Sequence, residues 1–472
     1  MALKSINPYT NEVIEEFESL SDEQIEEKIQ KSADAFIEWK YSTFEYRKKL
    51  MLKAADVLEE SKVLLSRYIS EEMGKVNSEA KSEVEKCAWV CKHYAHEAEV
   101  LLHREAVGTE AHMAFIEYEP LGTILGVMPW NFPFWQVFRF IAPTLMAGNV
   151  VLLKHASNVQ ISARAIENTL EKAGFPPGVF QNVQVGSDKV KGIIEHDVVK
   201  AVTLTGSEGA GQNVAEIAGH NIKKSVLELG GSNSFIVLDD ADIEKAVEIG
   251  LKARMQNAGQ SCIAAKRFII HERVSDEFVD RFTTELNKLK VGDPFGENTD
   301  LGPLSSVDQA EQVKEQVRKS VEQGAKIVAG GMPEKAVYPP TLVTHVKPGM
   351  PLFDEEVFGP VAPVIIAKDA EEAVKLSNRS KFGLGVSLFT NDLKKAQDLV
   401  PRFDDGAVFI NALVKSDPRL PFGGTKRSGY GRELAMQGIR EFVNVKTVYI
   451  DKFQDIEKEE GDSAISMGSP GS

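Results

Sequence analysis

One cysteine and one glutamate are the residues best suited to covalent chemistry in this chain. Cys262 closes a small, polar segment over 256–262, and polar surroundings suit a reactive thiolate better than a packed core thiol. Glu228 lies near the end of a predicted strand over 225–229, at the edge where open parallel sheets bind ligands. The 262 − 228 = 34 positions between them leave room for a strand, a helix and a loop. Both side chains can then face one cleft as nucleophile and base, with a core thiol and a solvated strand end as the alternatives.

A third candidate is the side-chain amide of Asn131. It stands between two prolines and two aromatic residues in the segment 129–133. Such a rigid frame can hold an amide donor toward a developing oxyanion. An ordinary proline-rich turn is the alternative interpretation of this segment.

Two predicted strand ends offer groups that could hold a phosphate. The strand over 150–153 is followed by Lys154 and, three positions later, by Ser157. Gly206 and Ser207 stand at the start of a predicted helix, where backbone N–H groups favour a diphosphate. Neither segment has the G-x-G-x-x-G pattern of dinucleotide-binding turns. Each segment alone is therefore weak evidence for a phosphate site.

The elements around these residues alternate between strands and helices. Residues 21–104 have apolar side chains at helical spacing, and strands follow over 113–128. From 149 to about 230, and again from 235 to about 410, short apolar runs alternate with helical segments. This order predicts two doubly wound parallel sheets, joined near the Gly230-Gly231-Ser232 junction.

Composition narrows the class of protein. The 472 residues suit two to four domains, and 55 basic against 70 acidic side chains leave a net charge of −15, which disfavours nucleic-acid or anionic membrane partners. Three cysteines cannot form a disulfide framework, and the first residues lack an export signal, so a cytoplasmic location is expected. Cys91, His93 and His96 lack a fourth ligand, and no metal site is expected.

Seven short blocks, in order along the chain, resemble the aldehyde dehydrogenase superfamily. The resemblance runs from Asn7 to about Ile450. The blocks are Pro129-Trp130-Asn131-Phe132-Pro133, Leu153-Lys154, Thr205-Gly206-Ser207, Glu228-Leu229-Gly230-Gly231, Gly259-Gln260-Ser261-Cys262, Glu356-Val357-Phe358-Gly359-Pro360 and Pro421-Phe422-Gly423-Gly424.

The resemblance implies a mechanism and a division of the chain. Cys262 would attack an aldehyde, Asn131 would hold the oxyanion, and Glu228 would activate the water that hydrolyses the thioester. The implied fold is a Rossmann-like cofactor domain and a catalytic domain with a small β extension for forming a homodimer or homotetramer. The expected bounds are 1–104 and 121–230 for the cofactor domain, 231–428 for the catalytic domain, 105–120 and 440–451 for the oligomerisation strands, and 452–472 for a disordered tail.

The resemblance also implies a set of cofactor-binding residues. They are Trp130, Lys154, Ser157, Gly206, Ser207, Leu229, Glu356 and Phe358. Many members that prefer NAD carry a glutamate where this chain has Ser157, and no acidic residue occurs from Lys154 through Ile166. NADP is therefore expected to be used at least as well as NAD.

Within the superfamily, the chain is most similar to bacterial succinate-semialdehyde dehydrogenases. An arginine at the position of Arg139 is typical of that group and would bind the substrate carboxylate, with an internal salt bridge as the alternative. Better-known members have a second arginine where this chain has Gln256. The other expected contacts to the substrate are Trp135, Ser261, Phe422 and the loop residues Lys415, Ser416 and Arg419.

Other functions stay open as alternatives. An enzyme for glutarate semialdehyde or for an uncharged aliphatic aldehyde would keep the same chemistry. A catalytically inactive dehydrogenase that serves as a scaffold would be expected to lose Cys262, Glu228 or Asn131, and all three are retained. A plain nucleotide-binding module would leave Cys262 unexplained.

Overall fold

The computed structural model describes residues 3–452 of the chain. The expected helical layer is present at the N-terminal end, after a β hairpin of β1 (Leu3–Ile6) and β2 (Val13–Phe17). Its helices are α1 (Asp22–Trp39), α2 (Phe44–Glu60), α3 (Lys62–Met73) and α4 (Asn77–Leu101). The expected disordered tail falls almost entirely outside the described residues.

The first large sheet has six strands, all parallel except β19. Their order is β19 (Gly429–Tyr430), β9 (Lys224–Glu228), β8 (Val199–Thr205), β5 (Thr123–Met128), β6 (Val150–His155) and β7 (Phe180–Asn182). The helices between them are α5 (Trp135–Met146), α6 (Gln160–Ala173), α7 (Val190–Glu195) and α8 (Glu208–His220). Every residue of β6 is buried, as expected for a parallel strand covered on both faces.

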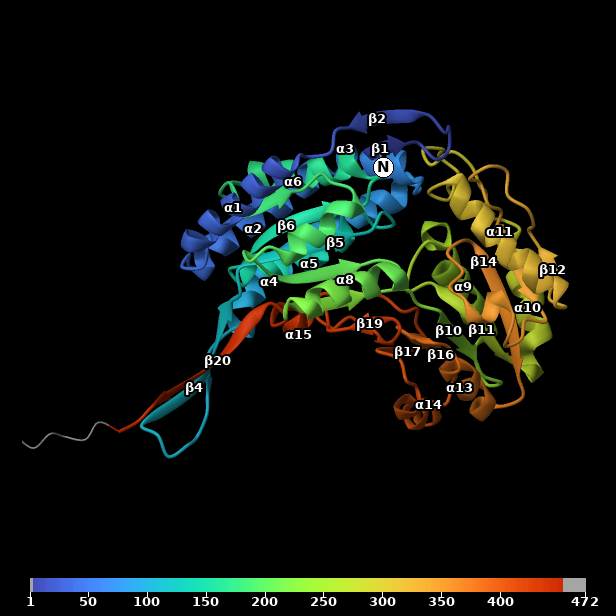
Figure 1. The fold of residues 1–472 in the computed structure, drawn as a ribbon. Helices are drawn as coiled ribbons and strands as arrows, with labels where there is room; N and C mark the ends of the chain where they lie inside the picture. Colours follow the sequence, from blue (N-terminus) through green and yellow to red (C-terminus); the bar gives the residue numbers. More distant parts are fainter. Residues whose placement is uncertain (1–2, 453–472) are drawn as a thin grey trace, which may run out of the picture.

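The second large sheet has seven strands, parallel except for the β12–β13 pair. Their order is β12 (Lys326–Ala329), β13 (Thr341–Thr344), β14 (Val361–Ala367), β11 (Ala265–His271), β10 (Asn233–Val237), β16 (Val386–Phe389) and β17 (Val408–Ile410). Its helices are α9 (Ile243–Met255), α10 (Ser275–Leu286), α11 (Val307–Glu322), α12 (Pro351–Asp354), α13 (Ala370–Asn378) and α14 (Leu393–Leu399). The expected α/β class is confirmed, and Figure 1 shows the two sheets in opposite halves of the body.

A three-stranded antiparallel sheet forms an arm that projects from the body (Figure 1). It is built from β3 (Glu105–Ala106), β4 (Met113–Pro120) and β20 (Val443–Ile450), with β20 paired to β4 along its whole length. These strands lie in the two segments expected to join subunits, and that role stays a prediction.

One segment after the second sheet returns to the first half of the molecule. β19 pairs with β9, and α15 (Ala435–Ile439) packs against α4 and α5. A small pair of β15 (Phe382–Gly383) and β18 (Thr425–Lys426) precedes this return. The sequence analysis assigned no role to residues 429–439, and the structure places them beside the end of β9, where Glu228 lies.

Candidate active site

The site lies between the two large sheets because the chain brings opposite strand ends together there. In the first sheet β5, β8 and β9 end just before Trp130, just before Gly206 and at Glu228. In the second sheet β11 begins three residues after Cys262, and β14 begins five residues after Glu356. The carboxyl edge of one parallel sheet therefore faces the amino edge of the other, in agreement with the expected common cleft.

Cys262 follows a sharp turn in the 3₁₀ segment Gln256–Gly259. Asn257, Ala258 and Gly259 all have positive φ angles of 54°, 50° and 75°. A side chain at Gly259 would collide with the backbone carbonyl of Gly359, so a glycine is required at this close approach. The left-handed backbone is strained at Asn257 and Ala258, a feature that often marks functional sites.

The loop that carries Asn131 is tied to the loop that carries Cys262. The Asn131 side-chain amide donates to the carbonyl of Gln260 at 3.1 Å, and the Asn257 amide donates to the carbonyl of Asn131 at 2.8 Å. Asn131 is buried. These contacts hold a fixed amide donor beside the residues that precede Cys262, as an oxyanion site requires.

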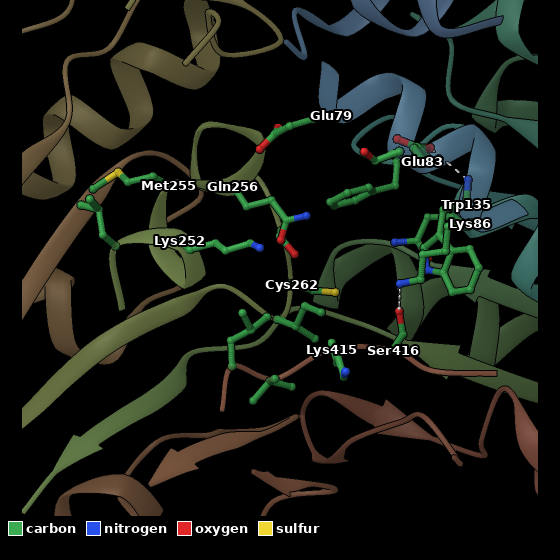
Figure 2. A pocket seen from close by; sticks show the side chains of 18 of the residues that line it. Glu79, Glu83, Lys86, Trp135, Lys252, Met255, Gln256, Cys262, Lys415 and Ser416 are labelled. Atoms are coloured by element: carbon green, nitrogen blue, oxygen red, sulfur yellow. Dashed lines mark hydrogen bonds between the residues drawn. The ribbon is translucent and has the colours of Figure 1, made fainter. Parts of the chain in front are cut away.

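Cys262 lies where two cavities meet. It lines a cavity of about 750 Å³ together with Trp135, and another of about 380 Å³ together with Trp130. Figure 2 shows the Cys262 sulfur directed into the first of these. A ligand bound in one cavity and a second ligand bound in the other would both reach the Cys262 sulfur.

The Cys262 thiol is neutral at pH 7 in the free protein. Burial raises its pKa to about 11, although Lys266 and Arg139 oppose the shift. The polar segment around Cys262 does not by itself lower the pKa of the thiol in the free protein, because burial at the junction of the two cavities outweighs the polar side chains. The thiolate must form when reactants occupy the site.

Glu228 is buried at the end of β9 and is only 2% exposed. Within residues 3–452 neither carboxylate oxygen has a hydrogen-bond partner. Burial raises the pKa of Glu228 well above its usual value, and the Glu433 carboxylate adds to the shift, while Arg139 and Arg432 oppose it. A carboxyl group in such surroundings suits proton transfer near neutral pH.

Arg139 forms the internal ion pair that the sequence analysis kept as an alternative. This residue of α5 is 1% exposed, and its guanidinium pairs with Glu433. The guanidinium also lies 4.5 Å from the centre of the Phe422 ring. Because Arg139 lines the larger cavity but already has a carboxylate partner, its charge is largely compensated before a substrate binds.

Six of the eight expected cofactor residues line the smaller cavity. They are Trp130, Gly206, Ser207, Leu229, Glu356 and Phe358. Trp130 and Phe358 pack edge to face at 5.8 Å, and Ser207 caps α8. The two others, Lys154 and Ser157, are absent from its lining and belong to the neighbouring end of β6, where burial lowers the pKa of Lys154.

Lys266 holds Glu356 in place, and the sequence analysis missed it. Its amine is buried at the start of β11 and donates to Glu356, to the Gly231 carbonyl at 2.8 Å and to the Cys262 carbonyl at 3.1 Å. Two adjacent charged residues, Lys266 and Arg267, in the otherwise apolar run 265–271 were the available signal. Through these bonds Lys266 joins Glu356, which lines the smaller cavity, to the Cys262 backbone.

The larger cavity contains most of the expected substrate contacts. Trp135, Arg139, Gln256, Ser261 and Phe422 line it. Arg419 does not: its side chain is 68% exposed and forms an ion pair with Asp417. Its expected contact with the substrate is not supported, because this neighbouring carboxylate holds the guanidinium away from the cavity.

Charged residues that the sequence analysis did not assign to the site also line the larger cavity. They are Glu79, Glu83, Lys86, Glu248, Lys252 and Asp300. The Glu83 carboxylate accepts hydrogen bonds from the backbone N–H groups of Phe134 and Trp135, at 2.9 and 3.0 Å, and so fixes the start of α5.

Comparison with known proteins agrees with this geometry. A model of the aldehyde dehydrogenase family matches residues 1–448. The chain belongs to this family. It is 48% identical over 453 residues to a probable succinate-semialdehyde dehydrogenase (NADP+) of Synechocystis sp., a match that covers 95% of this chain and 100% of the relative.

Other members of the family are also similar over nearly the full length. A succinate-semialdehyde dehydrogenase (NADP+) of Mycobacterium avium is 47% identical over 457 residues, which cover 95% of this chain and 97% of that protein. The solved structure of succinic semialdehyde dehydrogenase from Streptococcus pyogenes in complex with NADP+ has a TM-score of 0.94 at 35% identity, covering 96% and 100% of the two chains. The resemblance inferred from the seven blocks is confirmed.

Two further observations concern ligands and membranes. Across residues 3–452, no three His, Cys, Asp or Glu side chains are grouped closely enough to hold a metal ion. In the same part of the chain, none of the helices is both long and apolar enough to span a membrane.

Proposed function

We propose that this aldehyde dehydrogenase oxidises succinate semialdehyde to succinate. It uses NADP+ as oxidant at least as well as NAD+. The observation that carries the proposal is the position of Cys262 at the junction of two cavities. One is lined by aromatic rings and by both cations and carboxylates, and the other by six of the expected cofactor residues. The names of the relatives point to the same substrate and cofactor.

The residues of the chain divide the reaction between them. The Cys262 thiol gives its proton to solvent water and its sulfur attacks the aldehyde carbon, while Asn131 stabilises the oxyanion. Held in the smaller cavity by residues such as Gly206, Ser207 and Phe358, NADP+ would supply the acceptor for the hydride that the aldehyde carbon loses. Glu228 then takes a proton from the water that attacks the thioester, which releases the carboxylic acid and restores the Cys262 thiol.

The smaller cavity fits a dinucleotide. The start of α8 offers backbone N–H groups beside Gly206 and Ser207, which suit a diphosphate. The perpendicular rings of Trp130 and Phe358 leave an apolar wall. We assign the far end of the cofactor to Lys154 and Ser157, where a cation and a hydroxyl without an acidic neighbour in sequence suit a 2′-phosphate.

We also propose that the chain forms a homodimer or a homotetramer through the arm of β4 and β20. The outer strand β20 exposes the large apolar side chains of Val445 and Tyr449. An exposed apolar edge strand is a site for pairing with another chain. A second copy of this chain would cover it in a symmetric assembly.

Initial rates of NADPH formation test the proposed reaction. We expect kcat/KM for succinate semialdehyde to exceed that for butanal by about 100-fold, because a charged contact to the carboxylate supplies roughly 2 to 3 kcal/mol. We expect glutarate semialdehyde to fall between the two. Equal values for succinate semialdehyde and butanal would contradict the proposal and favour an uncharged aldehyde.

A further inference from the structure

The larger cavity contains a cation whose charge has no carboxylate partner. Lys86 projects from α4 into the cavity that Cys262 also lines (Figure 2). Its amine donates to the Ser416 hydroxyl at 2.8 Å and lies 4.1 Å from the centre of the Trp135 ring. Within residues 3–452 no carboxylate oxygen approaches this amine within the 4.0 Å of an ion pair. Ser416 and Trp135 therefore orient the ammonium group without neutralising it.

The other cations near the cavity are less suited to hold a carboxylate. Arg139 is paired with Glu433 and Arg419 with Asp417. Lys252 and Lys415 also line the cavity, but both are exposed, so water and salt screen their charges. A partly buried, oriented and uncompensated ammonium gains the most from a bound anion.

We propose that Lys86, held by Ser416, is the principal anchor of the substrate carboxylate and thus determines the preference for a carboxylated aldehyde. This inference rests on the proposed function. In this arrangement the aldehyde carbon lies at Cys262, the carboxylate lies at the Lys86 amine, and the intervening methylene groups pack against Trp135.

The surroundings of Lys86 make its charge sensitive to pH. Burial lowers its pKa to about 8, and the Arg139 charge from α5 adds to the effect. Glu83 and Cys87 on α4, together with Asp417, oppose it. A lysine in these surroundings is charged at pH 7 and loses its charge above pH 8, so affinity for the carboxylate should fall there.

Three variants test the anchor through kcat/KM for succinate semialdehyde and for butanal. In Lys86→Met we expect a loss of about 30- to 100-fold for the semialdehyde, mostly in KM, and a change of less than about threefold for butanal. Lys86→Arg keeps a cation and should retain most of the preference. Lys92→Met is the matched control on α4, because Lys92 is paired with Glu59 outside the cavity, and its kinetics should match the wild type.

Failure of the anchor and failure of the proposed function have different signatures. A wild type that shows no preference for the semialdehyde over butanal contradicts the proposed function. A wild type that prefers the semialdehyde, with a Lys86→Met variant that keeps this preference, overturns the anchor alone. An equal loss for both aldehydes in Lys86→Met would also overturn it, since that loss indicates a structural role.

The pH dependence adds a test that a structural role would not satisfy. The ratio of kcat/KM for the two aldehydes cancels ionisations that affect both, such as that of Cys262. We expect this ratio to fall above pH 8 in the wild type and to stay level in Lys86→Arg. Glu79 lines the same cavity, and burial raises its pKa to about 7, but Glu79 ionises in the wild type and in Lys86→Arg alike. If the ratio changed with pH in the same way in the wild type and in Lys86→Arg, the proposal would be overturned.

Discussion

At the scale of single residues, the free protein keeps its nucleophile neutral. Cys262 is half-buried, and its neighbours include the cations Lys266 and Arg139 as well as the carboxylates Glu356 and Glu228. Burial is the largest cause and decides the direction of the shift, although the two cations oppose it. A neutral thiol is protected from oxidants and other electrophiles until reactants bind.

This state of the thiol predicts a simple pH dependence of alkylation. Because the pKa of Cys262 is raised to about 11, the thiolate fraction should increase by about tenfold per pH unit between pH 7 and pH 10. The rate of inactivation by iodoacetamide, without substrate or cofactor, should follow it. Cys87 and Cys91 are fully buried and should stay unmodified in the native protein. A rate that levels off below pH 9 would contradict the raised pKa.

At the scale of elements, strand ends and helix starts place the reacting groups. The bounds of some elements can be predicted: the apolar spacing over 161–173 predicts a helix, and α6 is found there. The apolar run over 179–185 predicts a strand, but β7 is shorter, because its pairing with β6 ends at Leu153 and Asn182. Val183 and Val185 continue the apolar run because they pack into the core rather than into the sheet.

Contacts between distant elements could not be predicted from the pattern of a single sequence. Arg139 and Glu433 are 433 − 139 = 294 positions apart, and the segment that carries Glu433 reaches Arg139 only because residues 429–439 return to the first sheet. Lys86 and Ser416 meet in the same way. Cys262 and Asn131, in contrast, lie in short segments of unusual composition, which the sequence itself displays.

The end of β6 should govern the choice of cofactor. In Ser157→Glu, a carboxylate would repel a 2′-phosphate and accept hydrogen bonds from the ribose hydroxyls instead. We expect kcat/KM for NADP+ to fall by about 10- to 100-fold while that for NAD+ stays level or rises. Ser157→Ala is the matched control and should change either value by only a few-fold. Equal losses for both cofactors would contradict the assignment of Ser157.

The start of α5 depends on one buried carboxylate. Glu83 accepts from two backbone N–H groups of α5 and forms an ion pair with Lys75, which is also buried. Glu83→Gln leaves the Lys75 charge unpaired, so we expect a loss of about 3 kcal/mol in unfolding free energy and a lower Tm. Glu85→Gln on the same helix removes an exposed pair with Lys62 and should change Tm little. Equal Tm values for the two variants would contradict this role.

At the scale of the whole molecule, two cavities are lined by residues of both halves and meet at Cys262. The fold class and the position of the catalytic groups between the sheets follow from the alternation of strands and helices. The arm of β4 and β20 projects from the body and exposes apolar side chains, which we propose are covered by a second copy of the chain.

The assembly should be visible in the native mass. We expect light scattering after size-exclusion chromatography to give two or four times the 52.0 kDa of one chain. Val445→Asp should shift the mass toward smaller species, because it places a charge on the exposed apolar face of β20. Asn444→Asp, at the neighbouring position on the opposite face, should leave the mass unchanged. A monomeric wild type would contradict the proposed role of the arm.

The most direct test of the proposed reaction is to trap the thioester in Glu228→Gln. Without the base, hydride transfer should still occur but hydrolysis should slow by about 100-fold or more. Mixing this variant with succinate semialdehyde and NADP+ should give one rapid equivalent of NADPH, and peptide mass spectrometry should find a succinyl group on Cys262. Unmodified Cys262 after a rapid NADPH burst, or a succinyl group on another residue, would contradict the account.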